Sequence, residues 1–218
     1  MSTPKIKIDV VSDVVCPWCY IGKRRLEKAI HQLHGEVEVE LEFHPFELNP
    51  DMPKEGRNQK EYLTDKFGGA DRFKQLTSHV SKVAAEEGLK FNYDNQHISP
   101  NTRDAHRIIR LAKEEGVQPA VKESFMKAYF EEGIDLSKRE NLIDVAAKAG
   151  LNAARVSSLL NSDEGLAEVE LEEKINYQRG ISGVPYYIIN NKYGVSGAQP
   201  TEVFVQALRE IAKEPVQQ

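Results

Sequence analysis

The two cysteines of the 218-residue chain, Cys16 and Cys19, stand three positions apart in the segment Cys16-Pro17-Trp18-Cys19. A disulfide between them would close almost no loop, so the pair gains little as a structural staple. In a reducing compartment this spacing is typical of redox chemistry or of metal binding. The alternative, two cysteines that only pack in a core, does not explain why a proline follows the first of them.

The first cysteine is expected at the start of a helix. Pro17 suits the first helical position, and an apolar stripe at helical spacing follows, formed by Leu26, Ala29, Ile30 and Leu33. Cys16 is then the N-cap residue, where unpaired backbone N–H groups and the helix dipole favour the thiolate, which is the nucleophile of disulfide exchange. We therefore predict that Cys16 attacks a substrate disulfide. Cys19, one turn deeper and less exposed, is predicted to resolve the mixed disulfide.

A zinc site is the competing interpretation, because Cys16, Cys19, His31 and His34 superficially follow the spacing of a zinc finger. A finger needs its cysteines on a hairpin and its histidines on a helix folded back onto them. Here all four residues fall on one helical pattern, on which Cys19 and His31 would lie about 18 Å apart. We therefore expect no metal at these residues and place both histidines at the end of the helix.

Strand patterns flank the helix. Residues 5–11 alternate charged and apolar side chains, and residues 37–43 do the same after Gly35, the glycine expected to close the helix. The segment 45–57 holds three prolines and is expected to be a loop.

The middle of the chain has helical spacing, with apolar stripes that are expected to face a core. Ser137 and Glu140 form a predicted capping box, and Asn152 is predicted to cap the next helix. After Gly180 two strand patterns, 185–189 and 193–195, are joined by an Asn-Asn-Lys turn, and an amphipathic helix ends the chain.

This order of elements predicts an α/β fold in which a small α/β unit is interrupted by helices. We assign residues 1–56 and 180–218 to the discontinuous α/β unit and residues 57–179 to the inserted helical domain. The alternative of two sequential domains would not return the chain to strands after the helices.

The composition narrows the classes of partner. The formal net charge of −5 gives no electrostatic reason to expect nucleic acid or an anionic membrane. No stretch approaches the roughly 20 apolar residues of a membrane span, and the first residues lack the apolar run of a signal peptide. We therefore expect a cytoplasmic protein; the sequence does not predict its oligomeric state.

Longer motifs resemble the thioredoxin superfamily and, within it, the DsbA-like branch related to FrnE. They are Asp-Val-Val-Cys-Pro-Trp-Cys-Tyr-Ile-Gly at 13–22, Phe-Glu-Leu-Asn-Pro at 46–50, Asn-Thr-Arg-Asp-Ala-His at 101–106, Gly-Val-Pro at 183–185, and Tyr-Gly-Val-Ser-Gly-Ala-Gln-Pro at 193–200. The resemblance implies a thioredoxin fold with a large all-helical insertion and a thiol–disulfide oxidoreductase or isomerase. It also implies that Val184-Pro185 is a cis peptide lying against the cysteines.

A cis bond there would turn the Val184 backbone toward the active site, where an extended substrate peptide could pair with it as an added strand. The predicted substrate-binding residues are therefore Pro17, Trp18, Val184 and Pro185. The expected partners are disulfide-containing proteins or glutathione. No cofactor is expected besides the redox-active disulfide, with glutathione as a candidate co-substrate.

One residue between the two cysteines differs from the DsbA sequence. DsbA carries a histidine between its cysteines, which stabilises the thiolate, whereas this chain has the neutral Trp18. We therefore expect a reduction potential between those of thioredoxin and DsbA, and a protein able to work as a reductase or an isomerase.

Two other functions compete with this one. A glutathione-dependent isomerase or a kappa-class-like glutathione transferase looks similar in architecture, but those enzymes use a serine where this chain has Cys16. The presence of both cysteines favours dithiol chemistry. A non-enzymatic module that binds peptides in a thioredoxin groove is the third alternative, and no residue pattern supports it.

Asp9 and Asp13 are the two candidates for a carboxylate that relays a proton to Cys19, and the sequence favours neither. The basic run Lys23-Arg24-Arg25 is interpreted as a solvated helix face.

Four residues elsewhere carry weaker signals. One interpretation is that the site is lined from the insertion by Asn101, Arg103 and His106. The alternative is that Asn101 caps a helix and that His106 lies on the surface. His44 is interpreted as an ordinary residue at the end of a strand.

Overall fold

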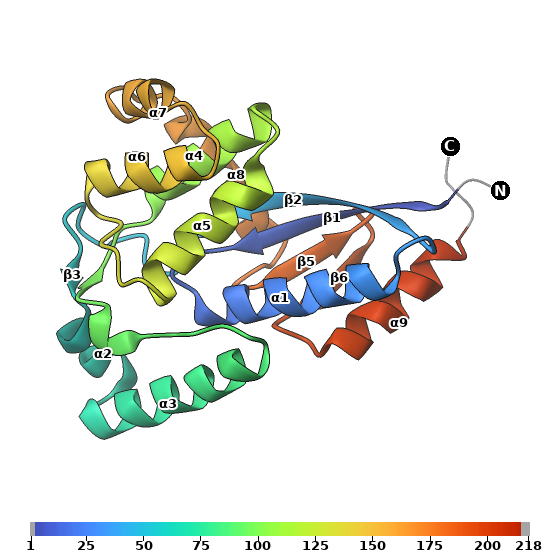
Figure 1. Ribbon diagram of the computed structural model, residues 1–218, viewed down its shortest axis with the longest axis horizontal. Helices are drawn as coiled ribbons and strands as arrows, with labels where there is room; N and C mark the ends of the chain where they lie inside the picture. Colours follow the sequence, from blue (N-terminus) through green and yellow to red (C-terminus); the bar gives the residue numbers. More distant parts are fainter. Residues whose placement is uncertain (1–2, 215–218) are drawn as a thin grey trace.

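A four-stranded mixed sheet organises the computed structural model, which describes residues 3–214 (Figure 1). Strand β1 runs parallel to β2 and antiparallel to β5, and β6 pairs with β5 at one edge. The strands, in spatial order, are β2 (Glu38–Pro45), β1 (Lys5–Ser12), β5 (Tyr186–Ile189) and β6 (Tyr193–Ser196). The parallel pair needs a crossover connection, which helix α1 (Pro17–Gln32) provides.

The β5–β6 hairpin confirms the turn predicted from the two asparagines. Asn190 and Asn191 have φ angles of 51° and 55°. Asparagine tolerates this left-handed conformation, which tight hairpins require because it matches the strand twist. Val184 and Pro185 come just before β5, which lies between β1 and β6 in the sheet.

Helices α1 and α9 (Thr201–Ala212) lie side by side along the sheet (Figure 1). The buried side chains of β1 that belong to the main core are Ile6, Ile8 and Val10. That core continues without a break into the inserted helices, so the sheet and the insertion share one apolar interior.

The inserted helices lie between β2 and β5 in the chain, and α4, α5 and α8 pack against β2. They are α2 (Gln59–Phe67), α3 (Ala70–Glu86), α4 (Arg103–Glu114), α5 (Gln118–Phe130), α6 (Arg139–Lys148), α7 (Ala153–Leu160) and α8 (Leu166–Gln178). The α/β class with a helical insertion is confirmed. The residue boundaries 1–56, 57–179 and 180–218 stay a prediction.

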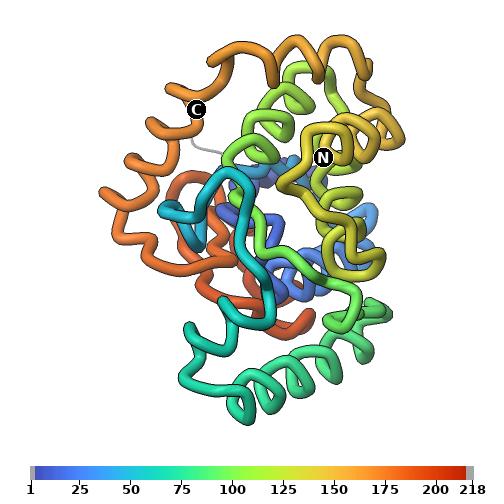
Figure 2. The backbone as a smooth tube through the Cα atoms, turned by 90° about the vertical axis from the view of Figure 1, so that its left-hand side faces the viewer, coloured from blue at the N-terminus to red at the C-terminus, as the bar shows by residue number. Residues whose placement is uncertain are grey.

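Helices α2 and α3 belong to an excursion that we call the helical arm, residues 59–97. Its base is closed by two short antiparallel strands, β3 (Arg57–Asn58) and β4 (Ile98–Ser99), and by a 2.9 Å hydrogen bond from Gln59 N to His97 O. Figure 2 shows the arm at one end of the molecule, apart from the other inserted helices.

Helix ends test three predictions. Asn152 caps α7, because its side chain accepts a hydrogen bond from Arg155 N at 3.0 Å. The capping box at Ser137 is wrong: α6 begins after Lys138, and the Ser137 hydroxyl donates to Asp135 instead. Helix α1 ends at Gln32 with Leu33 as its C-cap, so the prediction that Gly35 closes this helix is wrong.

Within residues 3–214, every helix is too short or too polar to cross a membrane.

Candidate functional site

Cys16 is the N-cap residue of α1, as predicted. Its Sγ accepts a hydrogen bond from Cys19 N at 3.3 Å, and Pro17 occupies the first helical turn. This contact gives the sulfur a backbone donor at the positive end of the helix, where negative charge is stabilised. The geometry suits a cysteine that reacts as a thiolate.

Cys19 differs from Cys16 more in surroundings than in exposure. Both cysteines are unbonded and buried, and Cys19, 2% exposed, is less exposed than Cys16, 3% exposed, by a small margin. Burial, together with the neighbouring Cys16, raises the pKa of the Cys19 thiol well above its usual value. Cys16 lies on the wall of a cavity and Cys19 lies behind it.

The Val184-Pro185 peptide is cis and lies against the cysteines, as the resemblance implied. The Cys16 thiol donates to the carbonyl oxygen of Val184 at 3.6 Å. Gly22 permits this close approach, because a Cβ at that position would lie 2.3 Å from Tyr187 Oη and 3.2 Å from Pro185 Cγ. The glycine of the cysteine motif therefore lets the start of β5 sit on α1.

A cavity of about 350 Å³ opens beside Cys16. Pro17, Trp18 and Val184 line it, while Pro185 lies outside it and packs toward Gly22. The Trp18 side chain is 37% exposed, and its ring centroid is 6.1 Å from that of His79 on the arm. The structure thus brings three of the four predicted substrate-binding residues to one cavity, with the arm as the opposite wall.

A buried lysine interacts electrostatically with both cysteines. Lys122, on α5, is 1% exposed and its Nζ donates to Ser12 O at 3.3 Å. Burial lowers the pKa of Lys122 to about 8, against the opposing effects of Cys19 and Asp13. The lysine in turn lowers the pKa of Cys19, so the two groups interact electrostatically.

Asp13 completes this buried group. Its carboxylate accepts a hydrogen bond from Leu48 N at 2.9 Å and lies 3.4 Å from His106 Nε2. Burial raises the pKa of the Asp13 carboxyl, but His106, the Leu48 backbone and Lys122 together outweigh burial, so the pKa lies below its usual value. Asp9 is placed elsewhere, in contact with His44 and Lys7. The structure therefore leaves Asp13 as the carboxylate near Cys19, and its role in proton transfer stays a prediction.

The three insertion residues singled out in the sequence lie outside the cavity. His106 is buried against Asp13, so its predicted surface position is wrong. Arg103 pairs with Glu47 at 2.8 Å, and the Asn101 side chain accepts from Arg103 N at the start of α4.

The basic run 23–25 is not a solvated face. Lys23 is buried and contacts Glu123 at 2.5 Å, and Arg25 pairs with Glu87 at 2.6 Å. Glu123 lies on α5 and Glu87 follows α3. The run therefore ties α1 to the insertion by charge, because two basic side chains find acidic partners on different helices.

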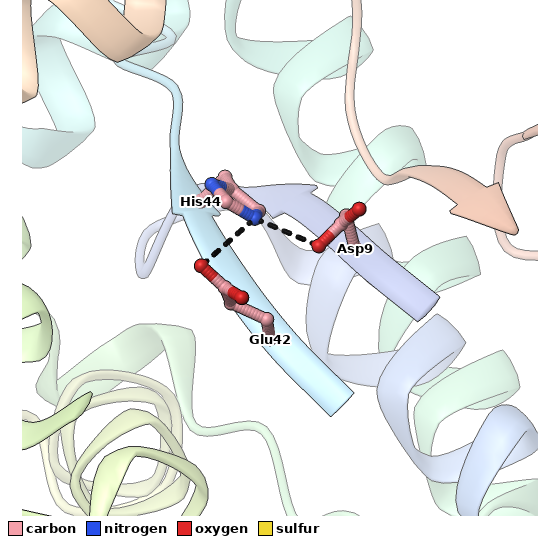
Figure 3. Close-up of side chains that lie close together, drawn as sticks. All are labelled: Asp9, Glu42 and His44. Atoms are coloured by element: carbon pink, nitrogen blue, oxygen red, sulfur yellow. Dashed lines mark hydrogen bonds and ion pairs between the residues drawn. The ribbon is translucent and has the colours of Figure 1, made fainter. Parts of the chain in front are cut away.

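Asp9, Glu42 and His44 form a second cluster on the sheet (Figure 3). The register of β1 and β2 sets Asp9 opposite Glu42, with His44 two residues further along β2. Lys7 Nζ lies 3.1 Å from Asp9 and 2.9 Å from Glu42, and Lys113 also contacts Glu42. The cluster is an ion-pair network in which lysines already balance the carboxylates.

This network predicts a pH-dependent stability. Burial lowers the pKa of His44, but the hydrogen bonds to Glu172 and Asp9 and the charges of Glu172 and Glu42 together outweigh burial, so the folded pKa lies above the usual 6.5. Protonated His44 therefore stabilises the fold below the unfolded pKa, and this stabilisation is lost as pH rises through the folded pKa. We expect His44→Gln to be less stable than wild type near about pH 6 and the difference to shrink toward about pH 9.

The measurement is urea unfolding of both proteins across that pH range. A stability difference that stays constant with pH would show that His44 acts through packing alone.

The mixed sheet, the Cys-x-x-Cys pair at the start of α1 and the cis proline before β5 define a thioredoxin-like domain. Residues 7–209 match the family described as DSBA-like thioredoxin domain. The chain belongs to this DsbA-like family.

Solved structures agree with this assignment. A probable DsbA oxidoreductase from Streptomyces coelicolor is 33% identical, with a TM-score of 0.90 over 98% of this chain and 93% of that one. The cytosolic disulfide reductase DsbM from Pseudomonas aeruginosa, solved with GSH, is 16% identical with a TM-score of 0.67 over 95% of this chain and 100% of its own. A 2-hydroxychromene-2-carboxylate isomerase is 15% identical with a TM-score of 0.70 over 95% and 96%. The last two share the fold.

Proposed function

We propose that this protein exchanges disulfides through the Cys16–Cys19 dithiol, acting on disulfides of proteins or of small molecules. The main support is the position of the Cys16 sulfur, which lies at the N-terminus of α1, on a cavity wall and beside the carbonyl of Val184. A substrate that reaches the cavity meets Cys16 first, while Cys19 is screened behind it.

The reaction has two steps. The Cys16 thiolate attacks one sulfur of the substrate disulfide, forms a mixed disulfide and releases the other sulfur as a thiolate. Cys19 then attacks Cys16 Sγ, which closes the Cys16–Cys19 disulfide and releases the second substrate thiolate. The protein dithiol is oxidised and the substrate is reduced, and a thiol reductant such as glutathione restores the dithiol.

Cys19 must lose a proton before it can attack, and Lys122 is the group we assign to receive it. The support is the burial of Lys122 and its electrostatic coupling to Cys19. A base with a pKa near the working pH is suited to proton transfer. Asp13 stabilises the protonated lysine by its charge.

Glutathione as reductant and the cytoplasm as compartment are parts of the same proposal. The DsbM disulfide reductase was solved with GSH and is described as cytosolic, and it shares this fold. No cofactor besides the protein dithiol enters the proposed reaction.

A glutathione-dependent isomerase is the second candidate, because a 2-hydroxychromene-2-carboxylate isomerase shares the fold. The cysteine pair favours the first candidate, since a glutathione-dependent isomerase has no use for a resolving thiol behind the nucleophile. Turnover of a disulfide-free substrate by the Cys19→Ser protein would favour the second.

The reduction potential tests the proposal. After equilibration in glutathione redox buffers, alkylation and mass analysis should show an internal disulfide with a potential between about −270 and −120 mV. The reason is a helix N-terminal thiol with a backbone donor, without a histidine between the cysteines. Failure to form the Cys16–Cys19 disulfide at any glutathione ratio would reject dithiol chemistry.

A further inference from the structure

Cys16 could attack a disulfide on the surface of a substrate without any cavity beside it, yet a cavity is present. Its volume of about 350 Å³ falls in the range of small-molecule sites, about 300–1,000 Å³. It lies between the helical arm on one side and the end of α5 with the start of α1 on the other. A group that enters it is enclosed by two walls, which suits a compact ring better than a continuing peptide.

The walls are apolar. Leu63 on α2, Leu76 on α3 and Tyr93 line the arm side, and Phe130 at the end of α5 lines the opposite side. Trp18 stands beside Cys16 on the same cavity. Removing apolar surface from water is the main gain that such walls offer a ligand, so they select an apolar group.

Three polar side chains of the lining, Gln59, Gln96 and Lys66, are engaged within the protein. The Gln59 side chain donates to Gln96 and to the Tyr129 hydroxyl, and Gln96 donates to Phe130 O at 3.3 Å. Lys66 donates to Asn49 Oδ1 at 2.5 Å. Charged groups of a ligand would have to break these contacts, which disfavours a polar tripeptide inside the cavity.

We infer that the cavity holds the aromatic or aliphatic group of a small apolar disulfide, whose sulfur is thereby presented to Cys16. The inference rests on the proposed function and names its substrate class. Cys16 forms a mixed disulfide with the apolar half, and the other half leaves as a thiolate. Cys19 then attacks Cys16 Sγ and releases the apolar thiolate, and a thiol such as glutathione re-reduces the protein.

Binding is tested without redox chemistry. Benzyl methyl sulfide, a thioether that cannot exchange, is titrated into Cys16→Ser protein while the fluorescence of Trp18, the single tryptophan, is followed. We expect saturable binding that 2-(methylthio)ethanol does not reproduce. Leu76→Glu, which places a charge on the cavity wall, should abolish binding. Ser78→Glu, the same charge at an exposed position of α3, should keep it.

Exchange is tested with two disulfides that both release alkanethiols. The mixed disulfide of benzyl mercaptan and 2-mercaptoethanol should exceed bis(2-hydroxyethyl) disulfide in kcat/KM by about tenfold or more, because its ring is buried. Leu76→Glu should remove the preference and Ser78→Glu should retain it.

Different results would overturn the apolar substrate class and the proposed disulfide exchange. Exchange of both disulfides at equal rates, with no thioether binding, overturns the apolar substrate and leaves the proposed function standing. Saturable thioether binding without exchange of either disulfide supports the apolar site and contradicts the proposed function.

Discussion

Cys16→Ser is expected to reduce disulfide exchange to the uncatalysed rate, whereas Cys19→Ser is expected to accumulate a mixed disulfide on Cys16. The reason is the asymmetry of the pair. Cys16 faces the cavity with a backbone donor at its sulfur, while burial raises the pKa of Cys19 behind it. Loss of the nucleophile stops the first step, and loss of the resolving thiol stops the second.

The first measurement is insulin reduction by each variant. Mass spectrometry of Cys19→Ser after mixing with a disulfide should then show the substrate half bound at Cys16. Alkylation of the reduced wild-type protein gives an independent check, in which Cys16 should react first. If both thiols are alkylated at the same rate near neutral pH, the roles assigned to them are wrong.

Local signals in the sequence are enough to predict where the nucleophile Cys16 lies. Pro17 suits only the start of a helix, so it places Cys16 at the N-cap, where the structure has it. The turn at Asn190 and Asn191 is predicted for the same kind of reason, because asparagine tolerates the backbone angles that the turn requires. Each of these features depends on residues within a few positions of one another.

The cavity could not be predicted in this way. Leu63 and Leu76 have the spacing of core residues, and only the folding of the arm toward α1 turns them into cavity walls. The basic run at 23–25 looks solvated for a related reason, since its acidic partners Glu87 and Glu123 are distant in sequence. Local patterns cannot distinguish a solvated charge from a charge that meets a partner on another helix.

Lys122 is the residue of the candidate site that the sequence reading missed, although a weak signal exists. It is spaced at i, i+3, i+4 and i+7 with Phe125, Met126 and Tyr129, all of which are buried. A lysine in line with such a stripe is either exposed at its edge or buried with a function. Whether Lys122 is buried decides between these two alternatives, and only the structure shows its burial.

Lys122→Met is expected to slow the second step of exchange, closure of the Cys16–Cys19 disulfide, on the order of 100-fold near neutral pH, the scale of a lost acid–base group. Lys122 lowers the pKa of the buried Cys19 thiol, so its removal leaves that thiol harder to deprotonate. The first step, attack by Cys16 on the substrate, should change far less. The rate of closure should therefore recover as pH rises, and the pH profile should shift toward higher pH.

Stopped-flow mixing with an aromatic disulfide separates the two steps, because each releases one thiolate. Lys127→Met is the matched control, since Lys127 lies on the same helix but is exposed on the surface. Urea unfolding shows whether either variant loses stability. Equal slowing of both steps, or a pH profile that does not move, would mean that Lys122 supports the packing around Ser12 rather than proton transfer from Cys19. The expected result, a selective and pH-dependent loss of closure, would make a side chain of the insertion part of the chemistry of the cysteine pair.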